Sequence, residues 1–166
     1  MSDVEVLRPI PIFAGLDEKR LAAILSVMRP RRVPGNTVIL KEGDRGDSLF
    51  ILASGSVEVT KRLGVVATLP TGDQKEKILV QLDAPQCFGE MGILEDTERS
   101  ATVSTRVECE LLEITKADFE RLGELDPKLG YRVTGNIAVV MAERLRRTNM
   151  DVVKLTVALS LALGVR

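Results

Sequence analysis

The chain has 166 residues, of which 45% are hydrophobic, 28% are charged and only 3% are aromatic. These values predict one compact domain with an aliphatic core and a modest appendage. A formal net charge of −1 gives no electrostatic footprint for nucleic acid or for an anionic membrane. The chain contains no histidine, which excludes Ser-His-Asp and Cys-His nucleophile systems and the usual imidazole metal sites. Catalysis by carboxylates or lysine survives this test as an alternative. We expect no enzyme, no catalytic residues, no metal site and no cofactor.

Three features bear on the cellular compartment. Cys87 and Cys109 fall in apolar, strand-like runs, which predicts buried and reduced thiols. Ser2–Arg8 carries two acids and no long apolar run, unlike a signal peptide. Val152–Val165 is too short to span a membrane and is interrupted by Lys154. A cytoplasmic protein without a membrane segment is expected.

The first predicted helix begins after Asp17, which can cap it, and ends before Pro30. From residue 33 to residue 114, short aliphatic runs rich in β-branched residues alternate with turn signals. Strands are expected at Thr37–Leu40, Leu49–Ala53, Val57–Arg62, Val65–Leu69, Ile78–Leu82 and Val107–Ile114. Many short strands at this spacing predict a barrel or a jelly roll.

Helical signals return after the last predicted strand. Thr115 begins a capping-box-like sequence for a short helix that reaches Leu122. Asp126 and Pro127 then supply a cap and a first-turn proline for a longer helix. We accordingly divide the chain into a domain over residues 1–125 and a C-terminal helix over residues 126–166.

The C-terminal helix carries a stripe of residues that recur in alternating steps of four and three. The stripe consists of Met141, Leu145, Thr148, Val152, Leu155, Leu159 and Ala162. This spacing predicts the seam of a parallel two-helix coiled coil, and hence a homodimer, with Thr148 as its one polar residue. The alternative is that the same stripe packs on the strands of its own chain.

The segment over residues 88–102 has the groups that a small ribose phosphate requires. Gly89 permits a positive φ and a close backbone approach, and the residues after it can form one helical turn with free amide groups. Arg99 offers a planar fork to the two exocyclic oxygens of a cyclic phosphate, and Ser100 adds a hydroxyl donor. Glu90 is an acceptor suited to a ribose 2′-hydroxyl and can balance the arginine in an empty pocket.

The strings Phe88-Gly89-Glu90-Met91-Gly92-Ile93-Leu94 and Arg99-Ser100-Ala101-Thr102-Val103 resemble the phosphate-binding cassette of the cyclic-nucleotide-binding domain family. The similarity is closest to the sensor domain of the bacterial catabolite activator (cyclic AMP receptor) branch, and it covers roughly residues 10–160. It implies an α+β, mainly β fold: an eight-stranded antiparallel jelly-roll barrel, or double-stranded β-helix. A short N-terminal helix, a cassette helix and a long C-terminal dimerisation helix would accompany the strands.

The resemblance also implies which residues bind the ligand. Glu90 would bind the ribose 2′-hydroxyl, and Arg99 and Ser100 the phosphate. Other implied contacts are the backbone at Gly89, Met91 and Ala101, the base and sugar lining at Val59, Leu79 and Val80, and the adenine region at Arg144, Thr148 and Asn149. In the activator branch one of the helix partners comes from the other subunit. Thr148 therefore has two interpretations, as a ligand contact or as a polar residue that sets helix register.

The function implied by the resemblance is a cyclic AMP sensor that transmits occupancy through its C-terminal helix to a dimer or to a downstream protein partner. Cyclic GMP is the second candidate ligand, since Asn149 replaces a serine of the activator pattern, and the residue after the arginine, here Ser100, is often threonine in members that respond to cyclic GMP. Activators of this branch continue into a helix-turn-helix domain, whereas this sequence ends at Arg166, so no DNA-binding domain is expected. The alternative function is a ligand-independent oligomerisation or docking domain of the same fold.

Overall fold

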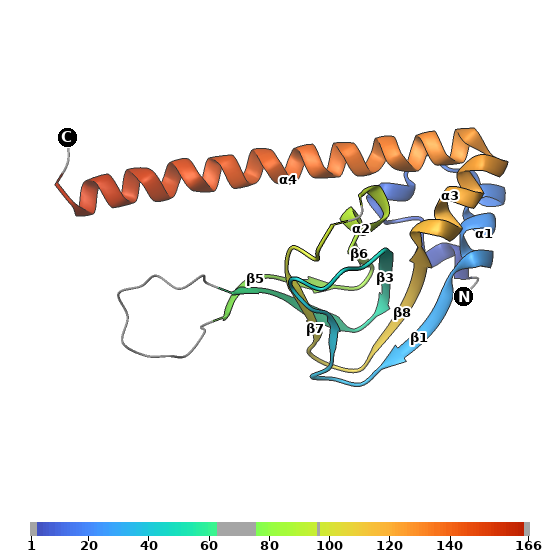
Figure 1. The fold of residues 1–166 in the computed structure, drawn as a ribbon, viewed down its shortest axis with the longest axis horizontal. Coiled ribbons are helices and arrows are strands. Elements are labelled where there is room, and N and C mark those ends of the chain that lie inside the picture. The colour runs from blue at the N-terminus through green and yellow to red at the C-terminus, as the bar shows by residue number, and fades with distance from the viewer. Residues whose placement is uncertain (1–2, 63–75, 96, 165–166) are drawn as a thin grey trace.

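The computed structural model describes residues 3–62, 76–95 and 97–164, and within them helices flank two β-sheets (Figure 1). The elements in chain order are η1 (Asp3–Val6), η2 (Pro11–Phe13), α1 (Glu18–Val27), β1 (Arg29–Val33), β2 (Val38–Leu40), β3 (Ser48–Ser54), β4 (Ser56–Arg62), β5 (Glu76–Asp83), β6 (Gln86–Phe88), α2 (Met91–Leu94), β7 (Thr102–Thr105), β8 (Cys109–Thr115), α3 (Lys116–Leu125) and α4 (Pro127–Ala162). The strand predicted at Val65–Leu69 lies outside the described residues.

The eight strands form two antiparallel four-stranded sheets, which confirms the predicted jelly roll. The first sheet has the order β1-β8-β3-β6 and the second has the order β2-β7-β4-β5. Unlike the predicted barrel, the two sheets do not close into one continuous sheet in the described part of the chain. Three strands were missing from the predicted runs, because β1 is mostly charged and contains Pro30, while β6 and β7 are very short.

The alternating side chains of β3 explain how the sheets and helices share one core. Phe50 and Leu52 pack between the two sheets, while Leu49 and Ile51 pack against the helices on the outer face of the first sheet. Because successive residues of a strand point to opposite faces, both faces of β3 are buried. The helical layer is therefore attached directly to the strand at the centre of the fold.

Two helix caps are connected by one arginine. Asp17 accepts a hydrogen bond from the backbone of Arg20 at 2.9 Å, as predicted for the first helix. Asp126 caps α4 by accepting from the backbone of Lys128 and Leu129. Arg20 Nε also donates to Asp126 at 2.7 Å, and this hydrogen bond lowers the pKa of the Asp126 carboxyl. Arg20 thus holds α1 beside the start of α4.

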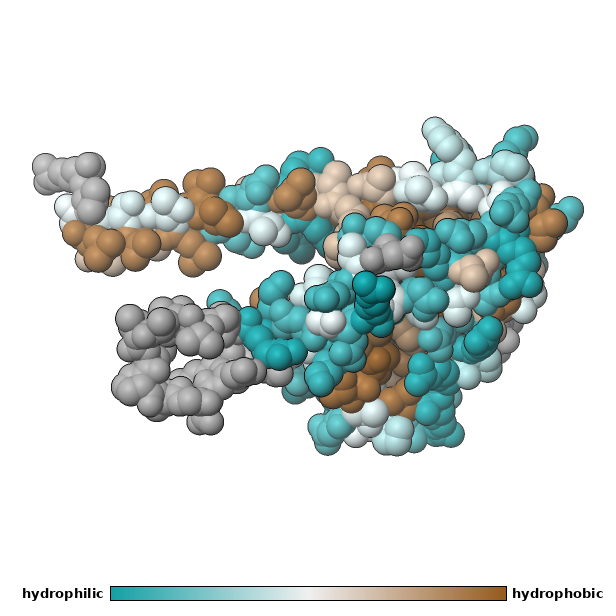
Figure 2. All heavy atoms as spheres, in the orientation of Figure 1, coloured by the Kyte–Doolittle hydropathy of each residue, from teal (hydrophilic) through white to brown (hydrophobic). Residues whose placement is uncertain are grey.

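The buried side chains of the long helix α4 all lie in its N-terminal part. Leu129, Val133 and Ile137 are buried, whereas Val152 and Leu155 are 55% and 69% exposed. Figure 2 shows apolar side chains on the C-terminal part of α4, which extends past the sheets. The alternative that the predicted stripe packs on its own strands is therefore wrong beyond Met141, because these side chains have no such cover.

The helices α3 and α4 meet through two glycines. α3 begins at the predicted cap Thr115 and continues past its predicted end at Leu122 to Leu125. A Cβ atom added at Gly130 would lie 3.0 Å from the Cα of Gly123, closer than ordinary van der Waals contact. A side chain at Gly130 would have to push the two helices apart.

This contact predicts opposite effects for two substitutions in the same helix. Gly135→Ala should raise the free energy of unfolding by about 0.5–1 kcal/mol, because alanine favours helix and the space beside Gly135 is open. Gly130→Ala should not show this stabilisation, because its methyl group would crowd α3. Its free energy of unfolding should be lower than that of Gly135→Ala by about 1 kcal/mol or more. Urea unfolding measures both, and equal stabilisation by the two variants would contradict the close contact.

Candidate functional site

A cavity of about 630 Å³ lies between the second sheet, the segment around α2 and the middle of α4. All the predicted ligand-binding residues line it except Asn149. One wall is apolar and comes from β4 and β5, through Val59, Leu79, Val80 and Leu82. Leu79 and Val80 are 54% and 46% exposed, so this wall presents apolar surface that is only partly covered.

Arg99 is held in the cavity by backbone contacts from two directions. Its Nη1 donates to the carbonyl oxygens of Ser48 at 2.9 Å and Gly89 at 3.3 Å. Its own backbone pairs with the loop between β2 and β3, donating to Asp44 at 2.8 Å and accepting from Gly43 at 3.0 Å. The position of the guanidinium is therefore determined by main-chain atoms, which are less mobile than side chains.

Three glycines make room for the Arg99 guanidinium. A Cβ at Gly92 would stand 2.6 Å from Nη1, and a Cβ at Gly46 would collide with the guanidinium directly. Gly89 has a φ of +77°, which a residue with a side chain rarely adopts, so both its conformation and its closeness to Arg99 favour glycine. Sequence reasoning identified Gly89 but missed the packing role of Gly46 and Gly92.

Burial and charge act on Arg99 in opposite directions. Desolvation lowers the pKa of the half-buried Arg99, while nearby carboxylates, first among them Asp47, raise it. An arginine guanidinium nevertheless stays protonated at neutral pH. The cavity therefore contains a permanent positive charge that is poorly hydrated, which favours an anionic ligand.

Glu90 and Arg144 connect the cavity to the long helix. Glu90 is only 3% exposed at the start of α2, and its carboxylate forms an ion pair with Arg144 of α4. In Figure 1, α2 lies below the middle of α4, and the ion pair joins the two elements. Sequence reasoning assigned both residues to the site without predicting that they pair with each other.

One face of α4 lines the cavity with four residues: Arg144, Arg147, Thr148 and Asp151. Their spacing of three and four residues puts them on the same side of a helix. Asn149 follows Thr148 and is turned by about 100° from it, so it is not among the lining residues of its own chain. Arg147 and Asp151 were missed, although their spacing from Arg144 is a signal that the sequence contains.

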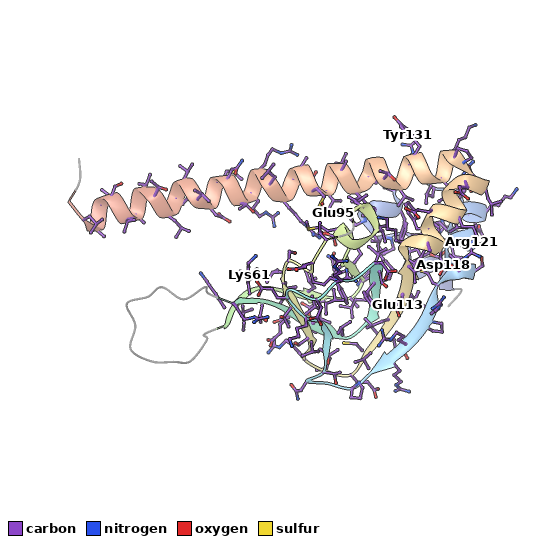
Figure 3. All side chains as sticks on the ribbon, in the orientation of Figure 1. Lys61, Glu95, Glu113, Asp118, Arg121 and Tyr131 are labelled. Atoms are coloured by element: carbon purple, nitrogen blue, oxygen red, sulfur yellow. The ribbon has the colours of Figure 1, made fainter. Side chains whose placement is uncertain are left out.

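Ser100 and Cys87 also line the cavity. The carbonyl of Ser100 accepts from Lys61 Nζ at 3.1 Å, and its exposed hydroxyl lies 3.9 Å from the sulfur of Met91. Figure 3 shows Lys61 toward the outer end of β4. Burial raises the pKa of the Cys87 thiol to about 12, so this thiol is neutral and unreactive at physiological pH. Cys87 and Cys109 are both free and buried, as predicted.

Comparison with known proteins agrees with this geometry. Residues 30–126 match the family model described as the cyclic nucleotide-binding domain. The chain is 36% identical over 146 residues to Glutaminase 1 of Bradyrhizobium diazoefficiens, covering 88% of this chain and 22% of that protein. It is 33% identical over 138 residues to the cAMP-activated global transcriptional regulator Vfr of Pseudomonas aeruginosa, covering 81% of this chain and 59% of that protein.

Among solved structures, the catabolite activator protein of Thermus thermophilus superposes with a TM-score of 0.75 at 29% identity, covering 88% of this chain and 63% of that one. The family match spans more than half of the sequence, so this chain belongs to the cyclic nucleotide-binding domain family. It spans less than two thirds of the length of each of these three relatives. In the described part of the chain, every helix is too short or too polar to cross a membrane.

The contact between Glu90 and Arg144 predicts a specific stability defect. Arg144→Gln should lower the free energy of unfolding by about 1–3 kcal/mol, because it leaves the buried carboxylate without its cationic partner. The double variant Glu90→Gln/Arg144→Gln should recover part of this loss, since no buried charge remains. Denaturant unfolding of these two variants and of Glu90→Gln, beside the exposed control Arg146→Gln, tests the pair. A loss of stability in the double variant equal to the sum of the losses in the two single variants would refute it.

Proposed function

We propose that this chain is a cyclic AMP-binding regulatory module. The observation that carries the proposal is the half-buried guanidinium of Arg99, held by main-chain carbonyls and surrounded by glycines inside a cavity with an apolar wall. A cyclic phosphate fits this environment because it is a compact monoanion with two exocyclic oxygens that a planar guanidinium can bind together. The relative named as cAMP-activated supports adenine as the base.

Each part of the ligand has a chemically matched surface. The phosphate binds Arg99, with the exposed hydroxyl of Ser100 as an additional donor. The ribose 2′-hydroxyl donates to the buried Glu90 carboxylate, which also pairs with Arg144. The purine packs on the exposed aliphatic side chains of Leu79 and Val80, which gain burial when the ligand is bound.

Ligand occupancy reaches α4 through the Glu90–Arg144 ion pair. A ribose hydroxyl that hydrogen-bonds to Glu90 shares this carboxylate with Arg144 and so changes the contact that holds the middle of α4 against α2. A ligand with different affinities for two positions of α4 would shift the population between them. The module thereby converts binding in the cavity into a change in the position of its long helix.

The exposed stripe on α4 supports a homodimer as the recipient of this signal. Leu145, Val152, Leu155 and Leu159 are all more than half exposed and recur with heptad spacing. A second copy of the same helix would bury them in a coiled coil, in which Thr148 lies both on the seam and on the cavity lining. Dimer geometry and nucleotide occupancy then become coupled through one shared residue.

The phosphate assignment is tested by substituting Arg99. Arg99→Ala should weaken cyclic AMP binding by about 2–5 kcal/mol, measured by titration calorimetry, because it removes the cation from a desolvated charge pair. Arg121→Ala is the matched control, since Arg121 lies on α3 with 68% of its side chain exposed and does not line the cavity (Figure 3). Wild-type affinity in the Arg99 variant would disprove the assigned site.

A thermal-shift comparison with cyclic AMP, cyclic GMP and cyclic di-GMP separates the proposal from its alternative, a ligand-independent docking domain. A ligand present at 100 times its Kd stabilises the folded protein by about 2.7 kcal/mol. We expect the largest shift with cyclic AMP, and none of the three should stabilise a docking domain. A larger shift with cyclic GMP would support the same binding site but would make guanine, not adenine, the preferred base.

The dimer is tested with two adjacent valines. Val152→Glu should convert the dimer to a monomer at micromolar concentration, because it buries a charge in the seam. Val153→Glu should leave the dimer intact, since Val153 is turned by about 100° from Val152 and is similarly exposed. Light scattering gives the mass of both variants, and a monomeric wild-type chain would remove the coiled-coil proposal.

A further inference from the structure

The aromatic residues of the chain are distributed unequally between the core and the surface. All four phenylalanines are buried, with exposed fractions between 2% and 9%: Phe13, Phe50, Phe88 and Phe119. Tyr131, the one tyrosine, is 83% exposed on the second turn of α4 and points away from the strands (Figure 3). Aromatic rings contribute strongly to protein interfaces when they are buried there, so this ring is available for contact with a partner.

Tyr131 lines a small cavity of about 180 Å³ at the start of α4, where the helix lies beside the end of η2 and the start of α1. The lining consists of Gly15, Leu16, Arg20, Lys128, Tyr131 and Arg132. Asn136, one turn beyond Arg132 on α4, donates to the backbone carbonyls of Ile12 at 3.1 Å and Ala14 at 2.9 Å. These hydrogen bonds hold the loop after η2 against α4, so the cavity is formed before any partner binds.

Every charged side chain in this lining is a cation. Arg20 is balanced by two carboxylates, because it forms ion pairs with Asp17 at 2.8 Å and Asp126 at 2.7 Å. Lys128 and Arg132 form no ion pair with any carboxylate of the residues that the structure describes. The cavity therefore has unbalanced positive charge, although the whole chain has a net charge of −1, and it favours an anionic group.

This cationic cavity is separate from the one that contains Arg99, and no residue lines both. Lys128 and Arg144 are 16 positions apart on α4, which corresponds to about 24 Å along the helix axis. In Figure 1 the start of α4 lies beside α1 and α3, at the end of the helix away from the exposed apolar stripe. A partner bound at the start of α4 would therefore compete neither with a ligand on Arg99 nor with a second copy of the stripe.

We propose that Arg20, Lys128, Tyr131 and Arg132, together the basic corner, form a docking surface for an acidic segment of a partner protein. A carboxylate of that segment enters the cavity and pairs with Lys128 and Arg132, while an adjacent apolar part of the segment covers the ring of Tyr131. Tyrosine and arginine are the residue types enriched where protein interfaces have most of their binding energy. The positive charge accelerates the encounter with an acidic partner.

The exposed ring favours a protein segment over a free oxyanion as the occupant. Inorganic phosphate can pair with Lys128 and Arg132, but it is too small and too polar to cover Tyr131 as well. The inference does not depend on the proposed nucleotide site, because the two surfaces share no residue.

A random peptide library displayed on phage tests the basic corner. The library is selected on the wild type, and counter-selection on Lys128→Glu/Arg132→Glu removes peptides that bind elsewhere. We expect the remaining peptides to be enriched in Asp and Glu. Tyr131→Ala, which takes no part in the selection, should weaken their binding about 5-fold or more. An absence of acidic peptides after counter-selection, or wild-type affinity in Tyr131→Ala, would overturn the proposal.

A charge reversal separates recognition from a defect in folding. The tightest peptide is made again with Lys at each acidic position, and it should bind Lys128→Glu/Arg132→Glu about 10-fold more tightly than it binds the wild type. A misfolded variant would show no such gain. Arg121→Glu is the matched control, because Arg121 is 68% exposed on α3 outside this lining and should leave binding of the acidic peptide unchanged.

Inorganic phosphate at constant ionic strength provides the remaining comparison. If phosphate raises the melting temperature of the wild type but not that of Lys128→Glu/Arg132→Glu, and no acidic peptide is recovered, the basic corner is a small-anion site and the docking proposal is wrong. Recovery of acidic peptides that need Tyr131 supports it.

Discussion

A guanidinium removed from water needs polar partners in fixed positions, and the arrangement around Arg99 depends on this requirement. Main-chain carbonyls of Ser48 and Gly89 accept from it, and glycines at positions 46, 89 and 92 allow those carbonyls to approach. The β2–β3 loop, the end of β6 and the start of α2 must all converge on this side chain. One charged group thus determines how three separated segments of the chain are placed.

The long helix α4 has three structural roles along its length, which follow from what each part faces. Its N-terminal part is buried through residues such as Leu129 and Ile137, its middle lines the cavity, and its C-terminal part is exposed and apolar. The Glu90–Arg144 ion pair lies where the packed part gives way to the exposed part. A change at that pair therefore acts on a helix that is fixed at one end and free at the other.

Much of the fold could be predicted from local patterns, because these patterns are properties of neighbouring residues. The caps at Asp17, Thr115 and Asp126 depend on interactions within a few residues, and all three were found in the structure. The strand β1 was missed for the opposite reason: Arg29–Val33 has no strand-like alternation and pairs because β8 lies beside it. The open edges of the two sheets likewise depend on pairing between distant strands.

By itself, the sequence determined the chemical groups of the site: the cassette string contains Gly89, Glu90, Arg99 and Ser100 within a short segment, so their proximity follows from chain connectivity. Only the tertiary structure decided which residues from other parts of the chain contact these groups. It paired Glu90 with Arg144, surrounded Arg99 with Gly46 and Gly92, and turned Arg147 and Asp151 toward the cavity while leaving Asn149 outside its lining. These contacts depend on the path and rotation of α4 and of the β2–β3 loop, which are set by packing among residues far apart in the chain.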